Sequence, residues 1–132
     1  DFAVPEGFDV LCCECRYAPK VITDAELKRE VITANIGKYV PREKLASYSA
    51  EEQTLVNLLT FSLDYEDKYI GCAHRHAPEM MHRISKDGSS SGFVSQGADA
   101  GNWHAVINIH SITSPVVTYS LKISAFRKEE IL

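Results

Sequence analysis

Four residues from position 66 onward are candidates for the groups that cleave RNA without a metal ion. That reaction needs a base for the 2′-hydroxyl proton, an acid for the leaving oxygen and a cation beside the phosphate. A carboxylate or imidazole can be the base, an imidazole the acid, and a guanidinium can hold two phosphate oxygens. The candidates are Glu66, Arg83, His104 and His110, each in a segment with strand-like composition. The same residue types are also common on a solvated sheet face, so both interpretations stand at this point.

Two of these histidines lie in one apolar segment, NWHAVINIHSIT. His104 and His110 are an even number of positions apart, so a strand places both imidazoles on the same face. At a rise of about 3.3 Å per residue they are roughly 20 Å apart, too far to touch one phosphate. His110 is therefore the candidate acid, and His104 is a recognition residue or a bystander. We expect that at least one of Glu66 and Arg83 does not face His110.

The segment CAHRHAP offers a metal site as an alternative. Cys72, His74 and His76 alternate, so a strand would point all three side chains the same way. A cysteine from the N-terminal region could complete a tetrahedral zinc set, although the spacing matches no standard finger or ribbon. A pair of surface histidines explains the same pattern. We predict no metal and no other cofactor, and keep this set as the alternative.

The cysteines form a cluster near the N-terminus and one isolated position. An even number in a short chain is typical of oxidising, secreted surroundings, and the start of the sequence fits a trimmed mature form. One bridge from the cluster to the isolated cysteine, a second pairing within the cluster, and a fully reduced set all remain open. The disulfide candidates are Cys12, Cys13, Cys15 and Cys72.

Length and composition predict one globular domain over residues 1–132. The chain is 45% hydrophobic and 24% charged, which suffices for one modest core. No run of about 18 apolar residues occurs, so we predict no membrane span. The formal net charge of −4 argues against a non-specific nucleic-acid binder, but a ribonuclease needs only a few local cations.

Two helices are expected before residue 65. The first starts at a capping box of Thr23 and Glu26 and ends at Gly37. The second, over residues 49–63, starts at another capping box and is followed by leucines and a valine. Residues 1–20 are expected to be an irregular arm with one short strand at 8–11. The apolar stripe of the first helix consists of Leu27, Val31, Ala34 and Ile36.

From residue 65 onward, the residue pattern is typical of strands separated by turns. Two helices followed by antiparallel strands predict an α+β domain. We expect one antiparallel sheet of about four to five strands, with one main helix packed on it and a second, shorter helix. The expected strands cover residues 66–74, 81–86, 92–96, 103–112 and 116–126.

The order of these features resembles that of the small guanyl-preferring ribonucleases of fungi and bacteria. It also resembles the ribonuclease-like secreted effectors of cereal powdery mildew fungi. The segments that carry the resemblance are CRYAP, the helix from residue 24, YVPREKL, YEDKYI, MHRISKDG and AVINIHSIT, within about residues 12–122. The resemblance implies Glu66 as base, Arg83 as the phosphate-binding arginine and His110 as general acid. Tyr39 would be a phosphate-facing tyrosine, and Arg42 would bind RNA beside it.

Several departures from the enzyme pattern favour the effector branch, which commonly keeps the scaffold and loses catalytic residues. The second helix is additional, Arg42 stands where the enzymes favour a histidine, and no cysteine lies near the C-terminus. The resemblance therefore implies a secreted fungal effector with an inactive ribonuclease-like scaffold. Such a protein would act inside a host cell by binding a host protein or RNA, affect immunity, and be open to recognition by an immune receptor. The alternatives are an active metal-independent endoribonuclease and a small secreted, metal-stabilised binding module.

Overall fold

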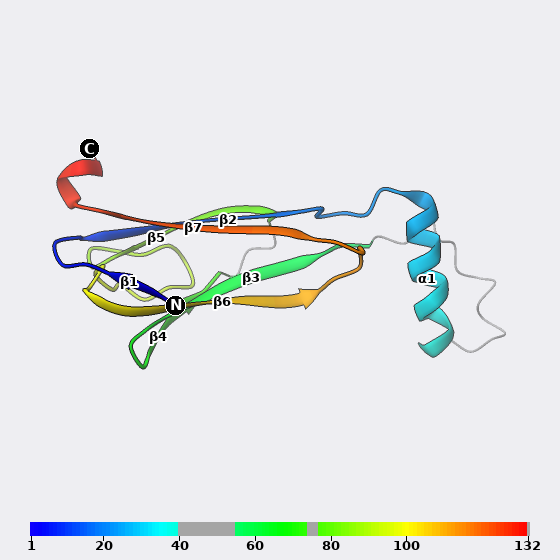
Figure 1. Cartoon of the computed structure of the whole chain (residues 1–132), viewed down its shortest axis with the longest axis horizontal. Coiled ribbons are helices and arrows are strands. Elements are labelled where there is room, and N and C mark those ends of the chain that lie inside the picture. The colour runs from blue at the N-terminus through cyan, green and yellow to red at the C-terminus, as the bar shows by residue number, and fades with distance from the viewer. Residues whose placement is uncertain (40–54, 74–76, 132) are drawn as a thin grey trace.

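Two antiparallel β-sheets pack face to face, and an α-helix stands across one end of them (Figure 1). The computed structural model describes residues 1–39, 55–73 and 77–131. Sheet A has the strand order β1-β6-β3-β4, and sheet B has the order β5-β2-β7. The elements are β1 (Phe2–Val4), β2 (Val10–Ala18), α1 (Ala25–Tyr39), β3 (Leu58–Tyr65), β4 (Lys68–Cys72), β5 (Glu79–Ser85), β6 (Gly101–Ser111), β7 (Thr118–Phe126) and the short 3₁₀ helix η3 (Lys128–Ile131).

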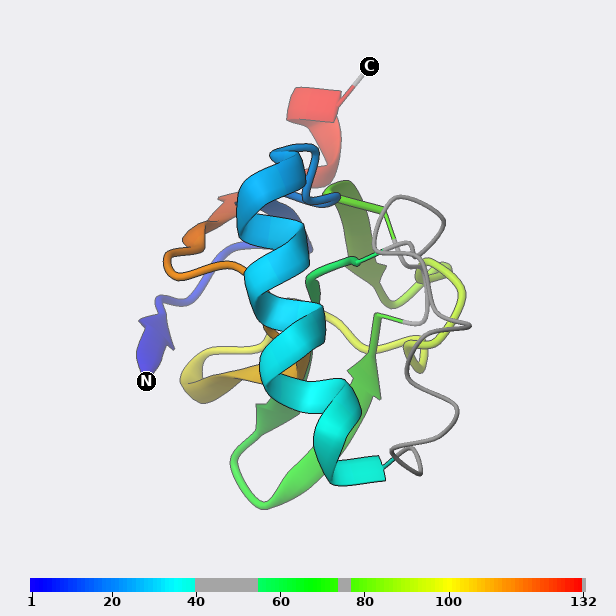
Figure 2. The same ribbon diagram turned by 90° about the vertical axis from the view of Figure 1, so that its right-hand side faces the viewer.

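The predicted mixture of helix and antiparallel strands is confirmed, but its arrangement differs from the expectation. The strands divide into two sheets, one of four strands and one of three, instead of forming one sheet. Helix α1 lies at the end of both sheets rather than on a sheet face, as the end-on view shows (Figure 2). The two sheets cover each other's apolar faces, so the helix is not needed to cover either.

The expectation of an irregular arm over residues 1–20 is wrong. This region contains β1 and the nine-residue β2, which is the central strand of sheet B. Side chains of β2 alternate: Leu11, Cys13, Cys15 and Tyr17 are buried between the sheets, while the intervening residues face outward. Proline and glycine residues flank the strand without interrupting it, because β2 pairs with a strand on each side.

The prediction of a second helix over residues 49–63 is also wrong for residues 55–63, the part that the structure describes. Residues 58–65 form β3, an inner strand of sheet A paired with β4 and β6. A short apolar run cannot be assigned to helix or strand from its period alone. Pairing along the length of β6 and burial of Phe61 and Leu63 favour the strand here.

The first helix is confirmed, with a different cap and a shifted buried face. The carboxylate of Asp24 accepts a hydrogen bond from the backbone N–H of Leu27 (3.0 Å), so Asp24 replaces Thr23 as the capping residue. Ile32 is buried, whereas Ala34, expected in the stripe, is exposed. In the described part of the chain, no helix has both the length and the apolar character required to cross a membrane.

Four of the five expected strands in the second half are confirmed as β4, β5, β6 and β7. The fifth, residues 92–96, forms no strand, and only an isolated bridge joins Phe93 to Gly71. The alternation predicted for β6 is seen in burial only at the start of the strand: Trp103 is fully buried and His104 follows it on the outer face, whereas Ile107 and Ile109 are exposed.

The core lies between the two sheets and is closed by aromatic side chains. Phe61 of β3 contacts His82 of β5 edge-on, and both rings pack against Phe93 from the loop after β5. At the other end of sheet A, Trp103 lies between Phe2 and Tyr65. These contacts join strands of both sheets and the loop into one apolar cluster.

We predict that Gly71→Ala destabilises the protein much more than Gly88→Ala does. Both glycines have similar positive φ angles, 148° and 153°, so alanine is strained in both. A Cβ on Gly71 would also meet the Gly92 carbonyl oxygen and lie 2.6 Å from Phe93 Cα, whereas a Cβ on Gly88 meets nothing within 4 Å. Overpacking should add about 1–3 kcal/mol to the loss of unfolding free energy. Equal losses in denaturant titrations would contradict this packing.

Candidate functional site

The structure does not bring together the three residues predicted to cleave RNA. Arg83 lies on β5, and its neighbours His82 and Ile84 are buried, so Arg83 faces outward from sheet B. His110 lies on the outer face of sheet A, where its Nε2 is 3.0 Å from Thr60 Oγ1. The two side chains therefore point away from the molecule on opposite sides of the sandwich.

Glu66 is distant from His110. It occupies the turn between β3 and β4 with a φ of 51°, and its Oε1 accepts a hydrogen bond from the Asn102 backbone N–H (3.0 Å). Asn102 and His110 stand eight positions apart on β6, which corresponds to about 26 Å along a strand. Glu66 shapes the turn beside the start of β6 and is out of reach of an acid at its far end.

The structure describes two of the three residues predicted to bind RNA, His104 and Tyr39. His104 Nδ1 contacts Asp1 Oδ1 (2.5 Å), so a carboxylate stands where a phosphate would have to approach. Tyr39 is the last residue of α1, at the helix end of the molecule. Arg42 lies outside the described residues.

The alternative metal set can be placed only in part. Cys72 pairs with Ser62 on sheet A, and its Sγ accepts a long contact from Asn108 Nδ2 (3.8 Å). His74 and His76 lie outside the described residues, so this set remains a prediction. Within the ranges that the structure describes, no three histidine, cysteine or acidic side chains are grouped to hold a metal ion.

All four cysteines are free thiols in the structure, so of the alternatives left open by the sequence it contains the fully reduced set. Cys13 and Cys15 point into the core, Cys12 points outward from sheet B, and Cys72 lies on sheet A. Adjacent and alternate positions on one strand point apart or lie too far apart for the usual disulfide geometry. Any disulfide within this set would require the strands to move.

The environment of the two core thiols makes them unreactive. Burial raises the pKa of Cys13 to about 12, with smaller contributions from the neighbouring Cys12 and Cys15. Burial also raises the pKa of Cys15, although its hydrogen bond to the Tyr119 hydroxyl (3.1 Å) acts in the opposite direction. Because the thiolate is the nucleophile, neither residue is a candidate for covalent chemistry.

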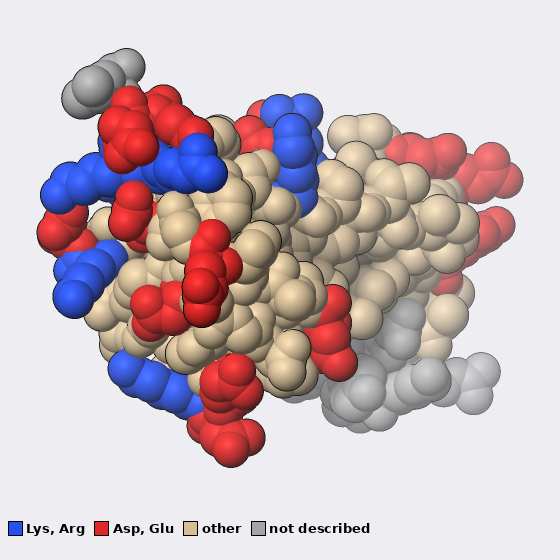
Figure 3. Space-filling model, turned by 60° about the vertical axis from the view of Figure 1, so that its left-hand side comes forward, with Lys and Arg blue, Asp and Glu red and all other residues tan. Residues whose placement is uncertain are grey.

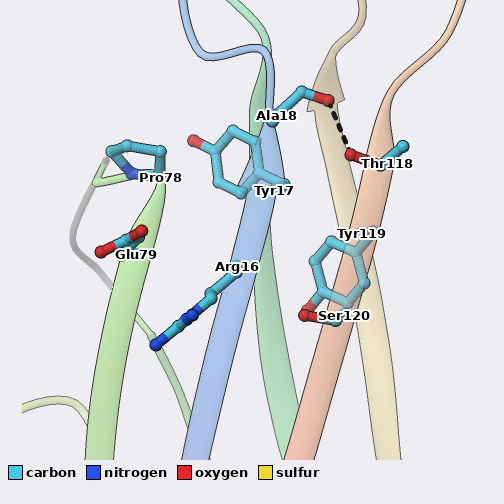
Figure 4. Close-up of a pocket in the computed structure, with 8 residues that line it drawn as sticks. All are labelled: Arg16, Tyr17, Ala18, Pro78, Glu79, Thr118, Tyr119 and Ser120. Atoms are coloured by element: carbon cyan, nitrogen blue, oxygen red, sulfur yellow. Dashed lines mark hydrogen bonds between the residues drawn. The ribbon is translucent and has the colours of Figure 1, made fainter.

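A pocket of about 480 Å³ lies at one end of sheet B (Figure 4). This is the end of the sheet nearest α1, as the ribbon in Figure 1 shows. It is formed where β2 ends, β7 begins and the chain enters β5. Two tyrosine rings and a proline give it apolar walls, and charged and hydroxyl groups lie around them. The lining residues are Arg16, Tyr17, Ala18, Pro78, Glu79, Thr118, Tyr119 and Ser120.

The charges around this pocket are balanced. Arg16 stands opposite Glu79 in the register of β2 and β5, and Figure 4 shows the two side chains next to each other. Lys20 donates to the Tyr17 hydroxyl (3.1 Å) and lies over its ring. Burial, followed by the contact with Cys15, raises the pKa of Tyr119, so its hydroxyl stays protonated. The lining offers donors, acceptors and aromatic surface, but among its described residues no histidine or cysteine that could act as a nucleophile or general base.

Asn57 holds the segments that form the walls of this pocket. Its fully buried amide donates to the Pro19 carbonyl (2.9 Å) and to Ser114 Oγ (2.8 Å), and its oxygen accepts from the Thr113 N–H (2.7 Å). The backbone N–H of Asn57 donates to the Lys20 carbonyl (2.9 Å). One side chain therefore fixes the exit from β2 and the connection from β6 to β7.

A second, smaller hollow of about 190 Å³ adjoins the pocket and shares Arg16 and Glu79 with it. It is also lined by Glu14 and by Met81, whose side chain is 67% exposed. We call the outward-facing residues Glu14, Arg16, Glu79, Met81 and Lys122 the sheet B face. Sequence reasoning missed this surface because it treated residues 1–20 as irregular. The alternation in LCCECRY would have placed Glu14 and Arg16 together on one outer face.

Comparison of the chain with protein-family models, curated proteins and solved structures gave no match. The interpretation of the site therefore rests on its residues and their geometry.

We predict that Cys12 and Cys72 react with a thiol reagent in the folded protein, and that Cys13 and Cys15 react only after unfolding. The first two are partly exposed, whereas the other two are fully buried. Burial raises the pKa of Cys12 as well as those of Cys13 and Cys15, so the prediction depends on access of the reagent to the thiol. Colorimetric thiol titration with and without denaturant, in the absence of reductant, measures both sets. Cys72→Ser should remove one thiol from the fast set. Fewer than four thiols in the unfolded protein would reveal a disulfide and contradict the structure.

Proposed function

We propose that this chain is a secreted effector whose ribonuclease-like scaffold is catalytically inactive and which acts by binding a protein inside a host cell. The observation that carries the proposal is the separation of Glu66, Arg83 and His110. Acid–base cleavage of RNA needs these groups within hydrogen-bond reach of one phosphodiester. Their positions on a turn and on opposite outer faces do not meet that requirement.

The charge distribution supports a protein partner over RNA. On the face shown in Figure 3, basic and acidic side chains are intermingled, without a continuous basic surface. Lys128 Nζ pairs with Asp87 Oδ2 (2.7 Å), and Arg127 lies beside Glu130. Nucleic-acid binding depends on cations free to neutralise phosphates, so carboxylates beside these cations weaken it.

The sheet B face and the adjoining pocket contain three residue types that are common at protein-binding surfaces, beside acidic and basic side chains. Arginine, methionine and tyrosine are enriched at protein interfaces, and Arg16, Met81 and the tyrosine-lined pocket lie next to one another here. Glu79 beside Arg16 would compete with an anionic ligand, which favours a partner that presents both a carboxylate and a donor group.

The effector assignment, with secretion and action on host immunity, is supported by the resemblance of the segments from CRYAP to AVINIHSIT. It does not depend on a disulfide, because the thiols are free in the structure. A surface loop or the sheet B face would be the part open to recognition by an immune receptor.

We predict that the purified protein does not cleave guanosine-containing RNA above the buffer background. His110→Ala and Glu66→Gln should leave this result unchanged, since neither group reaches a shared phosphate. Gel analysis of a labelled RNA, with a guanyl-specific ribonuclease as positive control, measures the cleavage. Cleavage that His110→Ala abolishes would overturn the proposal.

We also predict that a host protein retained by the wild-type chain is lost when the sheet B face is altered. Arg16→Glu and Met81→Ala should weaken binding about tenfold or more, because arginine is a frequent interface hot spot and methionine is enriched at interfaces. His110→Ala, on the outer face of sheet A, is the matched control and should bind normally. Affinity measurements on the identified partner test this, with circular dichroism to verify folding. Equal binding by all variants would place the partner elsewhere and contradict this surface.

A further inference from the structure

β6 has an open edge over most of its length. On one side, β3 pairs with β6 from Trp103 to Ser111. On the other side, β1 pairs only with residues 101–103, and no other strand of the described chain pairs there. The edge beyond β1 is therefore a row of strand backbone without a neighbour in the described structure.

The backbone groups on this edge can be assigned from the hydrogen bonds on the opposite side. The carbonyl of Asn102 accepts from the N–H of Glu66 (2.9 Å), so Asn102 directs its backbone groups toward β3. Successive residues of a strand direct these groups to opposite sides. Ala105, Ile107 and Ile109 therefore present their N–H and C=O groups at the open edge.

This edge lacks the features that usually prevent strand addition. Natural edge strands are protected by charged residues, prolines, bulges or very short length. The segment from Ala105 to Ile109 reads AVINI and has no charge and no proline. Its apolar side chains are exposed, with Val106 at 46%, Ile107 at 37% and Ile109 at 64%. The irregularity near Leu58 comes only after Ile109 in the β6 register.

The segment is complementary to itself. In an antiparallel pair with its two-fold axis at Ile107, Ile107 faces its own copy, and the large Ile109 faces the small Ala105 of the second chain. Each of these residues presents backbone groups to the edge, so each opposed pair can exchange both hydrogen bonds. No charged side chains face each other, despite the net charge of −4 on each chain.

We propose that two copies of this chain associate through the β6 edges, which joins their A sheets into one continuous antiparallel sheet. The contact is isologous, because the same residues of both copies form it. The pairing ends where β1 begins, so β1 stays in place. β7 follows β6 in the chain, and residues 112–117 connect the two strands. The exposed Ile112 and Val116 of the connection between these strands would lie near the contact.

This association is independent of the proposed function, because the β6 edge and the sheet B face are separate surfaces. Analytical ultracentrifugation over a dilution series should show a species of twice 14.7 kDa that dissociates on dilution. A wild-type chain that stays at 14.7 kDa at all concentrations, up to the highest that remains soluble, would overturn the proposal.

Charge substitutions test the two-fold register. Ile107→Lys and Ile107→Glu should each weaken association at least about tenfold, because like charges then face each other at the axis. An equimolar mixture of the two variants should restore the dimer, since Lys then faces Glu. Failure of the mixture to associate would reject this register.

Val94→Lys is the matched control. Val94 is 46% exposed but lies in the loop after β5, away from the β6 edge, so its variant should remain dimeric. If Ile107 variants do not fold, Ile109→Lys tests the same contact at a more exposed position. Loss of the dimer in Val94→Lys, or its persistence in folded Ile109→Lys, would contradict the edge contact.

Discussion

The helix end of this molecule depends on one buried amide. Asn57 is fully buried, and its side chain bonds the segment leaving β2 and the connection from β6 to β7. The first segment leaves sheet B and the second connects sheet A to sheet B, so this side chain links the two sheets at that end. A buried amide without hydrogen-bond partners would reduce the stability of the fold. Few side chains other than an amide can donate to a carbonyl and accept from an N–H group at the same time. The geometry of the Arg16 and Tyr17 pocket follows from this constraint.

Much of the local structure could be predicted from the sequence. The alternation of β6 and β7 and the turn signals between strands correspond to the observed elements. The start of α1 was also predictable to within about two residues, with the helix beginning at Ala25 after Asp24. These features depend on residues close together in the chain, so the pattern of apolar, polar and turn-forming residues is enough to predict them.

Sheet membership could not be predicted, and the catalytic interpretation depended on it. Arg83 and His110 both lie on strands, as expected, but one strand belongs to sheet B and the other to sheet A. Nothing in the period of either segment records this division. Glu66 was predicted to lie on a strand, but it lies in the turn between β3 and β4. Its carboxylate there accepts a hydrogen bond from the backbone N–H of Asn102. The sheet B face was missed because β2 contains a glutamate and an arginine and few of the β-branched residues typical of strands, and because prolines and a glycine flank it.

The position of β2 has a consequence for how the chain folds. Its two neighbours come late: Leu11 pairs with Ile84 on one side and with Ala125 on the other. Contacts this distant in sequence form slowly, because long loops must close first. During synthesis, sheet B therefore cannot form completely until β7, near the end of the chain, has been made. Until then its three thiols are open to oxidants, and completion of the last strand encloses two of them.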